Sequence, residues 1–433
     1  MPGKSKIKVS ESKNWLRLDN AAKIFPVISN QVRTSVFRLS CELNEAVKLK
    51  ELQMALDETL DKFPYFRSQL KKGFFWYWLE PSEAVPLIQF DQDPPCRALM
   101  VERRNHLLLR VLAKDNMISV EFMHVLCDAG GGMKFLFSLM RQYGKNCGWD
   151  LNDSNDTTQP QGTLEEQMED SYKKYFNKYL PKPASLSKAY HLPFKVARRP
   201  ELKVNSFETS VSEIIKVSKK YKVSLTEYLA SVYLFVLQSF YLKSSAKDQR
   251  KNKSILRIEI PVNLRKIFPS STLRNFALFI MPEIDPKLGA YSFEEITQVV
   301  HHYMQLETDK RQIMRIIRRN VGGEKNLMVR AIPLFMKIPV LFVAFSLFGP
   351  NLYSGLITNV GKSNIPEDCS GYIKRLRFYP PPPDKKIKVS MAMISHGDRL
   401  VFSFGNLTST MKFEKEFIRF LQNEDINLKV LKA

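Results

Sequence analysis

The sequence lacks the short motifs by which the common hydrolases and metalloenzymes are identified. It contains no GxSxG segment, no HExxH segment and no CxxC pair, so we expect neither an α/β-hydrolase serine nor a zinc site of familiar spacing. The glycine run at 130–132 has neither the GxGxxG nor the GxxxxGKS spacing of a phosphate-binding loop. Packing space explains that run better, and we expect no metal and no permanently bound cofactor.

Cysteine is scarce and has no pairing pattern. The five cysteines are odd in number and widely spaced, at Cys41, Cys96, Cys127, Cys147 and Cys369. This favours a reduced, cytoplasmic setting over a framework of disulfides. Residues 1–15 contain no apolar stretch, so we do not expect a secretory signal.

Acidic residues are too few to balance the basic ones. The chain has 66 Lys and Arg against 44 Asp and Glu, which gives a net charge of +22. Such an excess favours an anionic partner, either the phosphates of a cofactor or lipid headgroups, although solubility alone could also explain it. The basic residues are dispersed and no nucleic-acid-binding motif is present, so no nucleic acid is expected.

Long apolar runs are rare, and the most apolar one is interrupted. Residues 331–347 are almost wholly apolar but include Pro333, Lys337 and Pro339. The run is shorter than the roughly 20 residues that cross a bilayer. We therefore expect a buried helix or a lipid-facing cleft wall, with peripheral membrane contact and a lipid-like acceptor or long acyl chain as open possibilities. The protein is expected to be a monomer.

The chain contains enough apolar residues, 44% of the total, for a sizeable core. Its 433 residues exceed the usual limit of one core, so we expect two halves, 1–180 and 181–433, joined through a polar and proline-rich region. Alternating apolar residues predict strands, and residues at helical spacing predict helices. The expected strands are 34–39, 74–79, 106–113, 118–123, 256–262, 353–358, 373–378, 389–394 and 400–404. The expected helices include one from about 44, one after 132, and others at 224–242, 292–319 and 413–421.

The stretch from residue 118 to residue 143 carries the best candidate for chemistry. A half-buried strand leads to His124, and a tight turn with Asp128 and Gly130 leads into a helix. An imidazole held at the end of a rigid strand, with a pKa near the working pH, suits a general base. A buried structural histidine, and an Asp128 that only caps the next helix, are the simpler alternatives.

These residues resemble a known motif. His124-Val-Leu-Cys-Asp128-Ala is similar to the HxxxDG motif of the chloramphenicol acetyltransferase-like superfamily, which includes alcohol acetyltransferases and peptide-synthetase condensation domains. Ala129 departs from that motif. Alanine tolerates fewer backbone conformations than glycine, so we expect standard geometry at Ala129, with Gly130 able to adopt a positive φ angle. Residues 261–265 with 273–276, and residues 357–361, resemble two further segments of the family in the same order. The chain looks most like bacterial alcohol acetyltransferase-like proteins.

The resemblance implies a mixed α/β fold of two lobes with a tunnel between them. It implies an acyltransferase in which His124 is the general base and Asp128 pairs with Arg265 to fix the turn. By the same resemblance Thr358, Asn359 and Gly361 shape the channel or bind the oxyanion. The co-substrate would be acyl-CoA and the acceptor a hydroxyl or an amine.

Three alternatives remain open. The donor could be an acyl group on a carrier protein, as in condensation-type relatives. The protein could instead be a catalytically silent scaffold or lipid-binding relative of the same shape. The third alternative, a basic nucleic-acid-binding protein, would bind nucleic acid in a salt-sensitive way.

Overall fold

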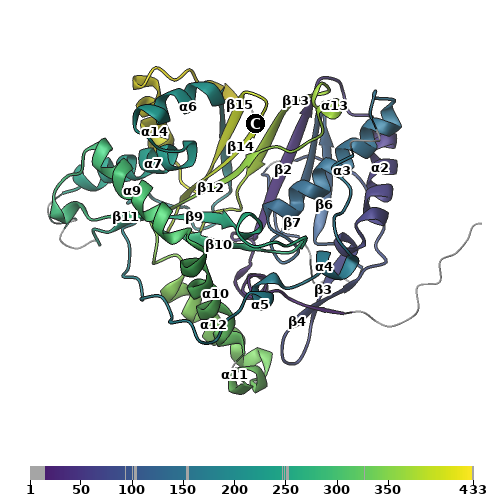
Figure 1. The fold of residues 1–433 in the computed structure, drawn as a ribbon, viewed down its shortest axis with the longest axis horizontal. Coiled ribbons are helices and arrows are strands. Elements are labelled where there is room, and N and C mark those ends of the chain that lie inside the picture. The colour runs from purple at the N-terminus through teal and green to yellow at the C-terminus, as the bar shows by residue number, and fades with distance from the viewer. Residues whose placement is uncertain are drawn as a thin grey trace, which may run out of the picture.

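The computed structural model describes residues 15–431 apart from 93, 100, 102–104, 153–155, 246, 248, 250–252 and 326. Two large sheets lie side by side, each covered on its outer face by helices (Figure 1). The first half of the chain builds most of one lobe and the second half builds the other. The predicted mixed α/β class with two lobes is what the structure has.

The sheet of the first lobe has five strands in the order β13-β2-β7-β6-β5. Their bounds are Ile373–Tyr379, Val36–Leu43, Met117–Met123, Leu109–Lys114 and Gln89–Phe90. Helices α2 (Leu49–Lys62) and α3 (Ala129–Cys147) cover its outer face (Figure 1). A separate small sheet, in the order β1-β4-β3, comprises Leu16–Arg17, Tyr77–Pro81 and Ser68–Lys72. The short helices α1, α4 and α5 span Phe25–Ile28, Leu164–Gln167 and Ser171–Lys174.

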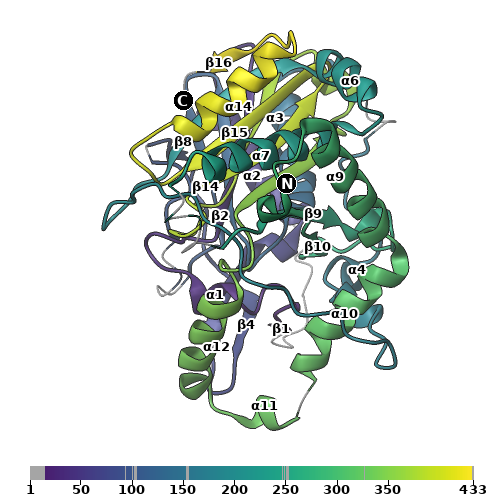
Figure 2. The same cartoon turned by 90° about the vertical axis from the view of Figure 1, so that its left-hand side faces the viewer.

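The sheet of the second lobe follows the order β10-β9-β12-β14-β15-β8-β16, and β11 pairs with β9 beside it. Those strands are Ala277–Ile280, Leu256–Asn263, Gly355–Lys362, Val389–His396, Arg399–Asn406, Lys203–Ser210, Lys429–Leu431 and Glu283–Ile284. Its helices α6, α7, α9 and α14 are Val211–Lys220, Leu225–Leu242, Phe293–Glu307 and Lys412–Asn423. The remaining helices α10, α11, α12 and α13 are Lys310–Glu324, Leu327–Ala331, Leu334–Phe348 and Glu367–Ser370. Figure 2 shows α10, α11 and α12 descending below this sheet.

One strand does not follow the predicted division at residue 180. Strand β13 belongs to the second half of the sequence but pairs antiparallel with β2, with Leu376 opposite Cys41. Arg377 joins Glu42 across this pairing at 2.9 Å. The second half therefore completes the sheet of the first lobe, and the two sheets share a boundary through β13.

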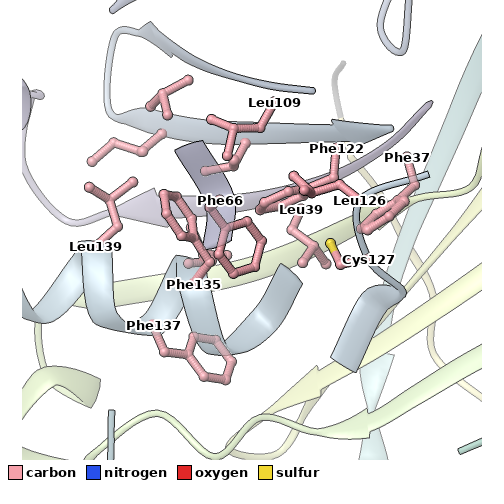
Figure 3. Close-up of a cluster of buried hydrophobic side chains, with 14 of the residues drawn as sticks. Phe37, Leu39, Phe66, Leu109, Phe122, Leu126, Cys127, Phe135, Phe137 and Leu139 are labelled. Atoms are coloured by element: carbon pink, nitrogen blue, oxygen red, sulfur yellow. The ribbon is translucent and has the colours of Figure 1, made fainter. Parts of the chain in front are cut away.

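The core of the first lobe explains why α3 forms where it does. Its apolar side chains at helical spacing, among them Phe135 and Leu139, pack against Phe37, Leu39 and Phe122 of the sheet (Figure 3). Asp128 caps the first turn, and Gly148, at φ +78°, ends the helix in the left-handed conformation that glycine allows. Cys127 is part of this core, so its role as a small buried side chain is confirmed.

Two of the expected elements differ in the structure. The helix expected over 292–319 is two helices, because Asp309 accepts a hydrogen bond from the amide of Arg311 and starts α10 anew. The strand expected over 74–79 begins only at Tyr77, because Phe74 and Phe75 form the exposed tip of the β3–β4 hairpin. Capping boxes begin α7 at Ser224 and α9 at Ser292, as the spacing of Ser and Glu predicts.

Helix α7 is long and apolar enough to cross a membrane by length and composition alone. It is mostly buried between the second sheet and helices α9 and α14, and its Glu227 contacts His301 at 3.1 Å. The core of a folded domain accounts for its apolar character.

Candidate active site at the seam between the lobes

His124 lies directly after β7, at the edge of the first lobe. Its amide donates to the carbonyl of Ser35 at 2.8 Å, and its ring stacks on Phe25 with centroids 5.0 Å apart. Phe37 packs against the same ring at 4.7 Å. The carbonyl of His124 accepts a hydrogen bond from Nδ2 of Asn275 at 2.9 Å. Both lobes therefore fix the position of the residue.

The electrostatics of His124 favour a neutral ring. Burial lowers its pKa to about 4, although the nearby Asp128 acts in the opposite direction. The pKa of His124 is therefore lower than the value near the working pH that the sequence predicts. Two aromatic rings shield the imidazole from water and so disfavour its charged form. Nδ1 is buried and has no hydrogen-bond partner within the described part of the chain. A neutral imidazole of this kind can accept a proton without first losing one.

Both carboxylate oxygens of Asp128 accept hydrogen bonds from groups that hold the local structure in place. Its Oδ1 accepts from the amide of Gly131 at 3.0 Å, and its Oδ2 accepts from the amide of Phe276 at 2.8 Å. Arg265 donates from Nη1 to the same Oδ2, also at 2.8 Å. Burial alone would raise the pKa of Asp128, but Arg265 and the two amides hold it below its usual value. Asp128 thus caps α3 and joins the two lobes at once.

Arg265 holds its own loop as well as Asp128. Its Nε donates to the carbonyl of Thr272 at 3.0 Å and its Nη2 to the carbonyl of Arg274 at 2.5 Å. The guanidinium therefore shapes residues 265–274 and presents that loop to the start of α3. The two side chains that the sequence pairs from opposite halves do lie together.

The glycine run is needed for a different reason at each position. Ala129 begins the helix with ordinary geometry, as expected, and Gly130 does not use the positive φ angle that glycine allows. A side chain at Gly130 would lie 3.1 Å from Nη1 of Arg265. At Gly131 a Cβ atom would lie 2.1 Å from the carbonyl oxygen of Leu273, which belongs to the second lobe. Close approach of the two lobes therefore requires glycine at Gly131.

Replacing Gly131 with alanine is expected to destabilise the protein by about 1–3 kcal/mol or more, because the backbone of Leu273 must move away. Gly323→Ala is the matched control: it also lies in a helix, and its Cβ would meet nothing within 4 Å. Alanine there is expected to be neutral or to stabilise α10 by up to about 1 kcal/mol. Urea unfolding of both variants measures the difference, and equal effects would contradict the close approach.

Two supporting residues were not predicted. Nδ2 of Asn275 also lies 3.2 Å from Oδ2 of Asp19, and that carboxylate lies 3.6 Å from Nε of Arg274. Asp19 is fully buried and accepts from the amide of Ala22 at 2.8 Å. Asn275 stands in the segment 273–276 that the family resemblance marks, so a signal for it was present. No pattern in the sequence singles out Asp19.

Thr358, Asn359 and Gly361 lie on β12, in the sheet of the second lobe. Nδ2 of Asn359 donates to Oγ1 of Thr226 at 2.8 Å, and Oδ1 accepts from the amide of Gly361 at 2.8 Å. Gly361 has φ +85°, where the pairing of β12 with β14 shifts register. Among the contacts of the described residues, none joins this segment to His124. Its role as the opposite wall stays a prediction.

No protein-family model matches the sequence, and no curated protein matches it. Several solved structures, in contrast, are similar to this chain. TRI101 of F. graminearum, complexed with coenzyme A and deoxynivalenol, is 10% identical over 94% of this chain and 97% of that chain, with a TM-score of 0.62. TRI3, a trichothecene 15-O-acetyltransferase from Fusarium sporotrichioides, is 10% identical over 94% of each chain, with a TM-score of 0.59.

A starter condensation domain of rhizomide synthetase, as a mutant in complex with C8-CoA, is 11% identical over 94% of each chain, with a TM-score of 0.63. Likeness at this level of identity concerns the fold. It covers nearly the whole of every chain compared. The two-lobed fold that the sequence predicts, and that these acetyltransferases and condensation domains share, is therefore confirmed.

Proposed function

We propose that this protein is an acyltransferase that moves an acyl group from acyl-CoA to a hydroxyl or amine acceptor. The observation that carries the proposal is the seam itself: a neutral, partly shielded His124 whose neighbour Asp128 is fully engaged with Arg265 and two amides. A carboxylate held in this way cannot exchange protons with the histidine, so His124 acts as the base alone. The fold shared with acetyltransferases supports the same assignment.

In the proposed reaction His124 removes the proton from the acceptor as its oxygen or nitrogen attacks the thioester carbonyl. A bond forms between acceptor and acyl carbon, the C–S bond breaks, and the proton passes from the imidazole to the departing thiolate. No enzyme nucleophile is required, and the positioned base contributes about 10² to 10⁴ in rate. Thr358, Asn359 and Gly361 are proposed to shape the opposite wall and help to bind the oxyanion, which is worth a few kcal/mol.

A donor held on a carrier protein is the second candidate. The observation that favours it is the likeness in fold to domains of peptide synthetases. Both donors carry the acyl group as a thioester at the end of a phosphopantetheine arm, so the chemistry at His124 is the same. Only the surface that receives the donor would differ.

The test is release of free thiol from acyl-CoA of several chain lengths, with alcohols and amines as acceptors, measured from pH 3 to pH 8. Because the pKa of His124 is about 4, its protonated and inactive form disappears as pH rises past that value. We expect kcat/KM to rise through about pH 4 and to stay level from pH 6 to pH 8. A rise centred near pH 6.5 would contradict the shielded base. Acyl transfer from a loaded carrier protein, with none from acyl-CoA, would identify the second candidate.

A further inference from the structure

The end of the molecule that holds α11, α12 and the tip of the β3–β4 hairpin exposes an unusual amount of apolar surface. In both views these elements lie together at the lower end (Figures 1 and 2). We call this surface the apolar end, and define it by Phe74, Phe75, Phe335, Val340, Val343 and Leu347. Their side chains are between 46% and 67% exposed. Clusters of large exposed apolar residues on this scale mark places where a protein binds a partner or a membrane.

The two parts of the apolar end are bound into one surface. The amide of Leu334, at the start of α12, donates to the carbonyl of Phe74 at 2.7 Å. Lys337 donates from Nζ to the carbonyl of Phe75 at 3.2 Å and lies 5.3 Å from the ring of Trp76. The lysine that interrupts the apolar run is thus used inside the structure. The exposed side chains of α12 that the structure describes are all apolar.

The length of α12 indicates how it would meet a bilayer. The helix has 15 residues, including Pro339. At 1.5 Å per residue it is about 22 Å long, which is shorter than the roughly 30 Å of a hydrocarbon core. Such a helix lies along a membrane surface and does not span it.

Charge identifies the kind of surface that fits the apolar end. No Asp or Glu occurs from residue 325 to residue 354, whereas Lys325 and Arg330 lie in that stretch, in or beside α11. The hairpin beside it carries Lys72 just before its aromatic tip, whereas Lys71 is paired with Glu80 across the hairpin at 3.4 Å. A second copy of this chain would bring the same positive charge against these residues, in a protein whose net charge is +22. An anionic lipid surface would instead be attracted to them.

We propose that the apolar end docks this protein on an anionic lipid bilayer, with α12 and the hairpin tip inserted among the headgroups. Helix α12 packs against α1, and Phe25 of α1 stacks on His124 at 5.0 Å. In the docked protein only the short helix α1 would separate α12, and so the lipid surface, from the candidate base His124. The docking does not depend on the proposed function, because vesicle binding can be measured without any reaction.

The test uses the full chain and sedimented vesicles of phosphatidylcholine, alone or with roughly one-third phosphatidylglycerol. Wild-type protein is expected to sediment with the anionic vesicles and to dissociate as salt is raised. Phe335→Asn combined with Val343→Asn is expected to reduce the partition coefficient about tenfold or more, because two apolar side chains no longer enter the lipid. The control combines Leu288→Asn with Val430→Asn, which are 82% and 71% exposed on other elements. It should bind as wild type does.

A hairpin variant, Phe74→Asn with Phe75→Asn, tests the same surface independently of α12. Thermal unfolding midpoints show that each variant is folded, since all of the replaced side chains are exposed. The proposal is overturned if wild-type protein does not bind the anionic vesicles, or if the α12 variant and the control bind equally well. Self-association of wild type that only the α12 and hairpin variants lose, without vesicle binding, would show that a second copy covers the apolar end.

Discussion

Replacing His124 with alanine is expected to lower kcat/KM for acyl transfer by about 10² to 10⁴, which is the usual contribution of a positioned general base. The fold should survive, because the contacts that fix this position from Ser35 and Asn275 are made to the backbone of His124. Thiol release from acyl-CoA, with the product identified by mass, measures the effect. His124→Gln is a useful second variant because it keeps a polar side chain of similar length without a usable base.

The matched control is His302→Ala, because His302 is an exposed histidine on α9 in the other lobe. It should leave the rate unchanged. If His124→Ala retained the wild-type rate with every donor and acceptor, the acyltransferase proposal would fail. Intact vesicle binding in that case would favour a silent, lipid-binding relative of the same fold.

The second large effect is expected at the ion pair between the lobes. Asp128→Ala leaves the guanidinium of Arg265 without its carboxylate, in a place where each side chain is only about one-tenth exposed. Removing one partner of a buried pair typically costs about 3–5 kcal/mol. The helix cap at Gly131 is lost as well. Unfolding in urea at pH 7 measures the change in stability.

The pH dependence separates charge from packing. The pKa of Asp128 lies below its usual value of 3.8 in the folded state, so the ion pair contributes stability above that value and loses it as pH falls. The difference in the free energy of unfolding between wild type and Asp128→Ala should therefore become smaller below about pH 4. Asp128→Asn keeps a side chain that can cap the helix, so it is expected to lose less stability than Asp128→Ala.

Two controls complete this experiment. In an Arg265→Ala background, Asp128→Ala should cost clearly less than it does in wild type, because the interaction is already gone. Arg419, which pairs with Glu416 on the exposed face of α14, should be replaceable by alanine without a measurable change. Full additivity of the Asp128 and Arg265 variants would contradict the pairing.

Much of the site could be predicted from the sequence because its key residues stand in local patterns. His124 follows an alternating strand, Asp128 precedes a helix, and Arg265 ends another strand. What the sequence could not show is how distant segments meet. The contact of Asn275 with the backbone of His124 joins residues 151 positions apart, and no local periodicity reports it.

Other details depend on what packs against each element. Gly130 does not need a positive φ angle, because Asp128 caps a helix that already begins at Ala129. Glycine is required at the next residue, Gly131, because the backbone of Leu273 approaches it closely. Neither fact is accessible without knowing what packs against the start of α3. The aromatic run at 74–79 predicts a strand by composition, but the strand begins only at Tyr77, because Phe74 and Phe75 belong to an exposed surface.

The pairing of β13 with β2 has a consequence for how this protein is made. Arg377 and Glu42 meet across 335 positions of sequence. While the chain emerges from the ribosome, β2 is an open sheet edge until β13 has been synthesised, and unpaired edges of this kind invite pairing with other chains. Such distant pairing also makes folding slow. The nascent first lobe is therefore the stage at which the edge of β2 is most exposed to pairing with another chain.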